Sequence, residues 1–204
     1  MRSVRAISLW GALLLATGGP AALALGSPLI AWRDPVYILA GFAGVVGMAL
    51  LLVQPLLVGG WLPGLTGRAG RQTHRALGVA LVVVVIVHVG GLWITSPPDM
   101  VDALLLRSPA LFSTWGVIAM WAVLAAGLIG ILRRRMATRL RVWRGLHTTL
   151  VSITVVFTVL HAVQIEGTME PWSKAALSGL ILLALVRVLL DRRVWSLWLR
   201  ARRS

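Results

Sequence analysis

The four histidines of this chain all lie in long apolar segments. They form two pairs with the same spacing of 14 positions, His74 with His88 and His147 with His161. An ionisable side chain inside a membrane span is costly and usually marks a functional site. In a helix, 14 residues fall about 40° short of four full turns and rise about 21 Å, so both histidines of a pair point to roughly the same face. Because imidazole is a common metal ligand, the pattern predicts metal binding inside a membrane.

The composition is that of an integral membrane protein. Of the 204 residues 58% are hydrophobic, the mean hydropathy is +0.88 and only 13% are charged, whereas soluble domains carry about 25% charged residues. The absence of cysteine excludes disulfides, iron–sulfur clusters, thiolate haem ligands and covalent haem attachment. The net charge of +14 comes from arginines clustered between apolar segments, which favours membrane topology over nucleic-acid binding.

Six apolar segments are long enough to be membrane-spanning helices. They are Ile7–Leu25, Val36–Val58, Thr73–Thr95, Leu111–Leu132, Gly145–Ile165 and Ala175–Leu190. No linker between them is long enough to separate domains. The sequence therefore predicts an all-α fold in which residues 1–204 form a single six-helix transmembrane bundle without a soluble domain.

The distribution of positive charge predicts the orientation of this bundle. Arginines concentrate at the two chain ends and in the second and fourth connections: Arg2, Arg5, Arg68, Arg71, Arg75, Arg133, Arg134, Arg135, Arg139, Arg141, Arg144, Arg192, Arg193, Arg200, Arg202 and Arg203. The other connections hold only Arg33, Arg107 and Lys174, together with five of the six acids, Asp34, Asp99, Asp102, Glu166 and Glu170. By the positive-inside rule both chain ends are cytoplasmic, as expected in a bacterial inner membrane.

The first apolar segment has a second interpretation. Arg2 and Arg5, the apolar stretch and the small residues Ala21, Ala22 and Ala24 also resemble a secretory signal peptide. We expect a retained first helix, but its removal would leave five helices in the same orientation, so the charge distribution does not decide between the two.

In this topology the third and fifth helices are parallel, which sets the pairing of the histidines. His74 and His147 form an inner pair, and His88 and His161 an outer pair nearer the outside. Two axial imidazoles would fill both open positions of a haem iron, and such a haem favours electron transfer over oxygen binding. Structural hydrogen bonding and a proton relay are alternatives. A shared zinc site is disfavoured, because its ligands must converge whereas the pairs are about 21 Å apart.

Charged residues near the histidines have a functional and a plain interpretation. Arg75 and Arg144 are candidate contacts for haem propionates, as are Arg71 and Arg141, but positive-inside topology accounts for them equally well. The outer acids, Asp99, Asp102, Glu166 and Glu170, could attract a cationic substrate or partner, or could simply be solvated loop charges.

Two segments resemble the ferric reductase-like transmembrane domain family, over residues of about 36–190. They are Thr73-His74-Arg75-Ala76-Leu77-Gly78 through His88, and Trp143-Arg144-Gly145-Leu146-His147 through His161. This family includes ferric reductases, the membrane cores of NADPH oxidases and the haem subunit of bacterial periplasmic methionine sulfoxide reductase. The resemblance implies a six-helix bundle in which such histidine pairs on the third and fifth helices hold two b-type haems, here with His74, His88, His147 and His161 as axial ligands of the iron.

The chain departs from the family in two respects. It has no Gly-rich dinucleotide loop after a strand, so its electron donor is expected to be a separate flavin (FMN or FAD) reductase or a membrane quinol. In addition, sulfoxide reductase haem subunits often have arginine where this chain has His74, which leaves open whether a flavin replaces one haem.

The leading hypothesis is therefore a dihaem b-type cytochrome, the electron-transfer component of an oxidoreductase that delivers electrons to a periplasmic redox partner or a small acceptor such as ferric iron. One alternative is a quinol-oxidising cytochrome b that anchors a periplasmic oxidoreductase. A further alternative, a non-redox transporter or assembly subunit, predicts no haem.

Overall fold

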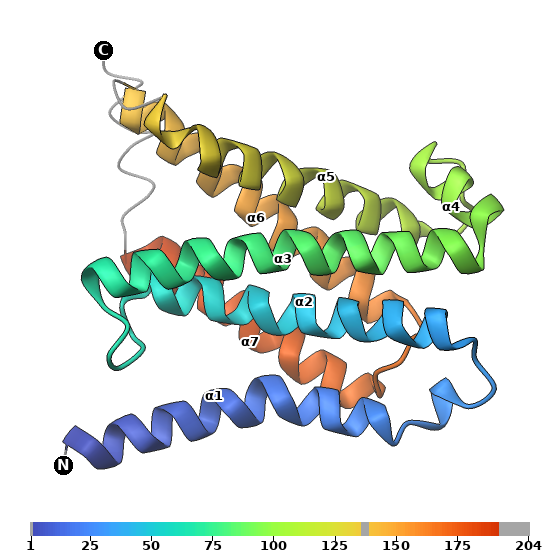
Figure 1. Ribbon diagram of the computed structural model, residues 1–204, viewed down its shortest axis with the longest axis horizontal. Helices are drawn as coiled ribbons and strands as arrows, with labels where there is room; N and C mark the ends of the chain where they lie inside the picture. The colour runs from blue at the N-terminus through green and yellow to red at the C-terminus, as the bar shows by residue number, and fades with distance from the viewer. Residues whose placement is uncertain (1, 136–138, 192–204) are drawn as a thin grey trace.

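The computed structural model describes residues 2–135 and 139–191, and in this part of the chain all regular secondary structure is helical, without strands (Figure 1). Its α-helices are α1 (Arg2–Leu25), α2 (Pro35–Gly59), α3 (Gly67–Thr95), α4 (Pro97–Leu104), α5 (Leu111–Ile131), α6 (Leu140–Gln164) and α7 (Pro171–Asp191). Short 3-10 turns, Pro28–Ile30 and Leu132–Arg134, follow α1 and α5. The C-terminal arginines expected at the cytoplasmic end, Arg192, Arg193, Arg200, Arg202 and Arg203, lie outside the described residues.

Six of these helices are long and apolar enough to cross a membrane, so the expected multi-pass helical protein is confirmed. They are α1, α2, α3, α5, α6 and α7, which coincide with the six apolar segments of the sequence. The exception is α4, an eight-residue helix after α3 that the sequence analysis did not anticipate. It is too short to span a bilayer, and it lies at one end of the bundle (Figure 1).

Several spanning helices extend beyond the apolar segments that predicted them. α3 begins at Gly67 rather than Thr73, α6 at Leu140 rather than Gly145, and α7 at Pro171 rather than Ala175. The added turns of α3 and α6 are rich in arginine, which is a good helix former. Hydropathy therefore underestimates the length of these helices, because it detects only the part that lipid can surround.

Local signals explain where α2 begins and ends. The carboxylate of Asp34 accepts the backbone N–H groups of Val36 at 2.7 Å and Tyr37 at 3.4 Å, and Pro35 occupies the first turn. At the other end Gly60 adopts a φ of 71°, the left-handed conformation that commonly terminates a helix. The helix is thus held at both ends by local sequence.

The bundle contains two helical hairpins that form its most extensive helix–helix contacts, α2 with α3 and α5 with α6. Helix α7 packs against α2 and α6, and α1 lies at the edge against α2 and α7 (Figure 1). Of the four largest fully buried side chains, three belong to α7, namely Leu177, Ile181 and Ser173. The interior of the bundle is therefore centred on α7, between the two hairpins.

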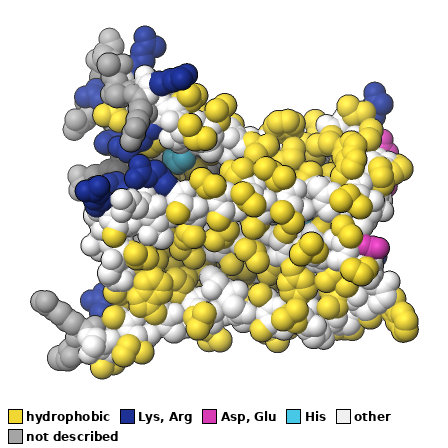
Figure 2. All heavy atoms as spheres, in the orientation of Figure 1, with side chains coloured by type: hydrophobic (Ala, Val, Ile, Leu, Met, Phe, Trp, Pro, Cys, Tyr) yellow, Lys and Arg dark blue, Asp and Glu magenta, His cyan; other side chains and the backbone are white. Residues whose placement is uncertain are grey.

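Charge separates the two ends of the bundle. Figure 2 shows most of the visible Lys and Arg side chains gathered at one end and acidic side chains at the other. We call the first the arginine-rich end; its described arginines include Arg68, Arg71, Arg75, Arg133, Arg135, Arg139, Arg141 and Arg144. The opposite, acidic end carries Asp34, Asp99, Asp102, Glu166 and Glu170.

Candidate functional site

The four histidines meet in the two pairs that the sequence predicts. The ring centres of His74 on α3 and His147 on α6 are 6.4 Å apart, with 77° between the ring planes. For His88 and His161, on the same two helices, the values are 6.3 Å and 79°. We call the first the arginine-end pair and the second the acidic-end pair. Helices α3 and α6 thus bring their histidines together at two levels, and the ring separation and ring angle are almost the same at both.

The separation within each pair is the one that a shared metal ion requires. An imidazole nitrogen binds a metal at about 2.0–2.1 Å, and the ring centre lies roughly 1.1 Å behind that nitrogen, so two imidazoles on opposite sides of one ion have their centres about 6.3 Å apart. Both observed separations agree with this value. Each pair could therefore supply the two protein ligands of a metal ion that a macrocycle also holds.

The rings of the acidic-end pair are oriented by backbone carbonyls. Nδ1 of His88 donates to the carbonyl oxygen of Ala40 on α2 at 2.7 Å, and Nδ1 of His161 donates to that of Phe112 on α5 at 2.8 Å. A carbonyl can only accept, so in both rings Nδ1 carries the hydrogen and Nε2 keeps its lone pair. A hydrogen bond from the ring nitrogen that does not bind the metal normally fixes the tautomer of a metal-binding histidine.

Two glycines allow these rings to approach the neighbouring helices. A Cβ atom on Gly44 would lie 3.1 Å from Nδ1 of His88, and one on Gly116 would lie 2.8 Å from Nδ1 of His161. Any other residue at these positions would push the imidazole away from its carbonyl partner. Gly44 and Gly116 are thus part of the site, although neither can bind a ligand through a side chain.

The arginine-end pair is held differently. Nδ1 of His74 and Nδ1 of His147 are buried without a hydrogen-bond partner, although the backbone of Gln54 and of Ala126 lies beside the respective rings. Instead, the indole of Trp143 stacks on the ring of His147, with centres 5.3 Å apart and planes 8° from parallel.

Trp143 is itself held from two sides. Its Nε1 donates to the carbonyl of Ile129 at 2.8 Å. The guanidinium of Arg133 lies 5.3 Å from the centre of the indole ring, within cation–π range. A stack of Arg133, Trp143 and His147 thus leads from the arginine-rich end to the first histidine pair.

The similar surroundings of His88 and His161 follow from an internal repeat that the sequence analysis did not recognise. Residues of α2 match residues of α5 at an offset of 72: Leu39/Leu111, Gly44/Gly116, Val45/Val117, Met48/Met120, Leu52/Leu124 and Leu56/Leu128. Residues of α3 match α6 at an offset of 73: Arg68/Arg141, Arg71/Arg144, His74/His147, Leu77/Leu150, Val82/Val155, Val83/Val156 and His88/His161. The carbonyl partners Ala40 and Phe112 also occupy equivalent positions. Aligning the chain with itself would have revealed both glycines.

A cavity of about 1110 Å³ surrounds the acidic-end pair. It exceeds the range of roughly 300–1,000 Å³ that small-molecule sites usually occupy. His88, His161, Gly44 and Gly116 line it, and it extends to charged residues of the acidic end, namely Arg33, Asp34, Asp99, Asp102, Glu166 and Lys174. We call it the acidic-end cavity. Its two imidazoles are the groups in its lining that could bind the iron of a haem.

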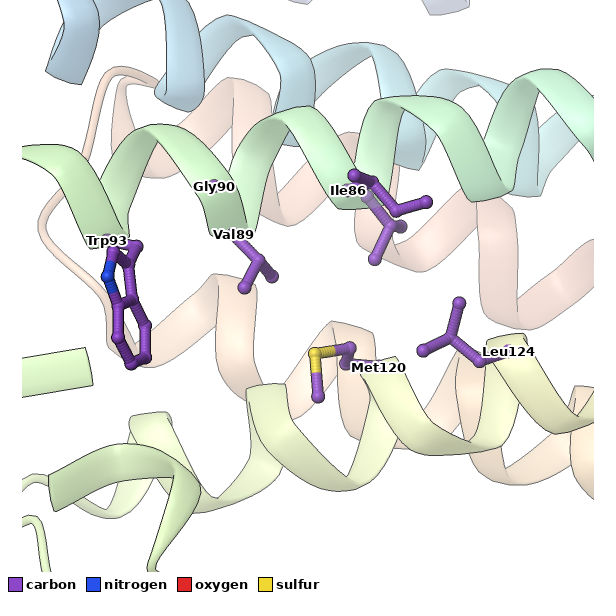
Figure 3. A pocket seen from close by; sticks show the side chains of 7 residues that line it. Ile86, Val89, Gly90, Trp93, Met120 and Leu124 are labelled. Carbon is purple, nitrogen blue, oxygen red and sulfur yellow. The ribbon is translucent and has the colours of Figure 1, made fainter. Parts of the chain in front are cut away.

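A smaller apolar slot adjoins this cavity between α3 and α5. It has a volume of about 250 Å³, and side chains of Ile86, Val89, Trp93, Met120 and Leu124 lie around it, next to Gly90 (Figure 3). Val85, Val89 and Met120 line both spaces. The acidic-end cavity therefore has an apolar wall on one side and charged groups at its mouth, which matches a macrocycle with an apolar edge and a carboxylate edge.

The four arginines named as candidate propionate contacts, Arg71, Arg75, Arg141 and Arg144, are all exposed at the arginine-rich end. Arg144 precedes His147 by three residues, so both lie on roughly the same face of α6. Arg71 occupies the equivalent position before His74. Arg75 directly follows His74, which places its side chain about 100° around α3, although its charge still acts on that ring.

Within the described residues, no three or more His, Asp or Glu side chains come together as a metal site. The histidines meet only as two separate pairs. Each pair offers two protein ligands, the number that an iron already held by a macrocycle needs. Comparison of the chain with protein-family models, with curated proteins and with solved structures finds no match. The site must therefore be interpreted from its own geometry.

Proposed function

We propose that this protein is a transmembrane dihaem b-type cytochrome that carries electrons across the membrane, resembling the membrane domain of ferric reductases. The observation that carries the proposal is the matched geometry of the two histidine pairs, 6.4 and 6.3 Å between ring centres on the same two helices. Repetition matters here, because one such contact could be an ordinary edge-to-face ring packing, whereas two with the same separation and ring angle fit a repeated ligand site.

In this proposal each residue has a limited role. His74 and His147 would hold one haem, and His88 and His161 the other, while the iron supplies the ferric–ferrous chemistry. Ala40 and Phe112 keep Nε2 of the acidic-end imidazoles available by accepting from Nδ1. The backbones of α3 and α6 are not closely packed, which leaves room between the paired rings.

The proposed direction of transfer rests on the family resemblance alone, whereas the proposed orientation in the membrane rests on charge. The arginine-rich end would face the cytoplasm of a bacterium. The donor would be a separate flavin reductase or a membrane quinol, and the acceptor a periplasmic redox partner or a small molecule such as ferric iron. The acidic residues around the cavity mouth suit a cationic acceptor.

The test is a haem count on the protein purified from cells supplied with a haem precursor. We expect two b-type haems per chain in a pyridine haemochrome assay, and b-type bands in the reduced-minus-oxidised spectrum. A variant with all four histidines replaced by alanine should bind none, and Thr149→Ala, at an exposed position of α6, should match the unchanged protein. A folded protein without haem would instead favour the non-redox transporter or assembly subunit.

A second experiment separates the two classes of donor. The oxidised protein is mixed either with NADH and a flavin reductase or with a reduced quinol analogue. Rapid reduction by the flavin system alone supports the ferric reductase-like function. Rapid reduction by the quinol analogue alone would favour the alternative of a quinol-oxidising anchor for a periplasmic oxidoreductase.

A further inference from the structure

Lys174 is the one charged residue among the described residues whose side chain is buried, with 8% exposed. It lies in the first turn of α7 and lines the acidic-end cavity together with His88 and His161. The other charged residues of the cavity lining are all exposed: Arg33, Asp34, Asp99, Asp102 and Glu166. The burial of this lysine therefore needs its own explanation.

The hydrogen bonding of Lys174 satisfies only part of its ammonium group. Nζ donates to the carbonyl oxygen of Ile165, at the end of α6, at 2.5 Å. The only ion pair in the described part of the chain joins Arg187 and Asp191, so Lys174 has none there. Glu166 acts on it only from beyond ion-pair distance. A buried charge without an anion is costly, and proteins normally pair it.

An anion that paired with Lys174 would lie in the acidic-end cavity, which this side chain lines. The charge of Lys174 is near enough to act on the ring of His161, one of the two proposed iron ligands. The cavity also adjoins the apolar slot, because Val85, Val89 and Met120 line both spaces. A ligand could place a metal between the two rings and an apolar edge toward the slot. Its acidic groups would then be free to contact Lys174.

We propose that Lys174 is the counter-ion of a carboxylate on the cofactor held between His88 and His161. This inference rests on the proposed function, since it takes that cofactor to be a haem, whose propionates are its only acidic groups. A charge-assisted hydrogen bond to a carboxylate would satisfy the buried ammonium. It would also fix the haem in the plane between the two imidazoles, with its carboxylate edge toward α7.

The test compares haem with its dimethyl ester, which has the same macrocycle and iron but no carboxylate. Both are titrated into the haem-free His74→Ala chain, in which only the acidic-end site keeps both ligands. We expect haem to bind about tenfold more tightly than the ester, the size of one charge-assisted hydrogen bond. Lys174→Gln can still donate to Ile165 but has no charge, and it should reduce that preference toward one. Lys174→Arg should keep most of it.

A redox titration of the chain with both haems tests the same inference without the His74→Ala substitution. Lys174→Gln should lower the midpoint potential of one haem only, because a nearby cation stabilises the more negative, reduced form. The inference is overturned if Lys174→Gln changes neither the preference for haem over its ester nor either potential. Failure of the proposed function is a different result, since then the unchanged protein binds no haem of either kind.

Discussion

The two histidine pairs have the same spacing but are held in different ways. At the acidic end both rings donate to backbone carbonyls and lie against glycines, so each is fixed from its far side. At the arginine-rich end neither Nδ1 has a hydrogen-bond partner, and only His147 has an aromatic ring stacked on it. Equal spacing therefore does not imply equal contacts around the rings, because position along a helix and orientation of a ring have separate causes.

The internal repeat shows where this difference originates. Gly44 and Gly116 are equivalent, so both halves provide the same close approach at the acidic end. Trp143, however, is equivalent to Gly70, which has no side chain to stack on His74. Gly70 is also packed against the backbone of Leu65, which leaves no space for a side chain. The two halves thus match around the acidic-end pair, whereas around the arginine-end pair they share the backbone neighbours Gln54 and Ala126 but differ at Trp143.

The largest effect is expected from removing a ligand. His88→Ala or His161→Ala should lower the haem content from two to about one per chain, because each pair lies on its own turns of α3 and α6, about 21 Å from the other. His74→Ala or His147→Ala should remove the other haem. The pyridine haemochrome assay measures both, with Thr149→Ala as the control. Loss of both haems from any single change would show that the pairs are not independent sites.

The next effect tests the glycines that distinguish the acidic-end pair. Gly116→Ala should displace His161 and reduce occupancy of that site strongly, since the added Cβ would lie 2.8 Å from Nδ1. Gly44→Ala should act in the same direction but less, at 3.1 Å from His88. Gly130→Ala, also on α5, adds a Cβ with nothing within 4 Å and serves as the control. Equal haem content in all three variants would refute the role of close approach.

A smaller effect is expected at the arginine-end pair. Trp143→Leu removes the ring stacked on His147, and an aromatic pair is worth about 1 kcal/mol, so haem affinity there should fall roughly fivefold. Trp143→Phe keeps a stacking surface and should lose less. Dissociation of haem to an apomyoglobin acceptor measures the change. Slower dissociation in Trp143→Leu, or an effect confined to the acidic-end haem, would contradict this assignment.

The smallest effect concerns the exposed arginines. Arg144→Gln should lower the midpoint potential of the arginine-end haem slightly, because a solvated ion pair contributes less than about 1 kcal/mol. The shift should shrink further at high salt, as expected for an exposed charge. Arg107→Gln, at the opposite end of the bundle, provides the control in the same redox titration. A shift in the midpoint potential of the acidic-end haem would contradict the assignment of Arg144 to the arginine-end haem.

Hydrophobic pattern and residue spacing were enough to predict the main architecture. The six spanning helices and the pairing of His74 with His147 and of His88 with His161 all follow from helical periodicity and from the alternation of charged connections. The turns added to α3 and α6, and the short helix α4, were missed because hydropathy does not register polar helical turns at the ends of a bundle.

Individual residues around the site were harder to predict. Lys174 was taken as a loop charge, because it lies between two apolar segments, but the early start of α7 at Pro171 brings it into a helix and buries it. Gly44 and Gly116 carry no chemical signal of their own. For Trp143, nothing in its spacing from His147 alone distinguishes a stacked indole from a lipid-facing one.

What the sequence determines by itself is thus the number of spans, the register of the histidines along α3 and α6, and the separation of charge between the two ends. These depend on periodicity and composition, which are properties of one segment at a time. The tertiary structure alone decides the ring separations, the carbonyl that each acidic-end imidazole meets, the stacking of Trp143 and the burial of Lys174. Each of these depends on how far apart two helices pack, and that distance is set by side chains on both of them.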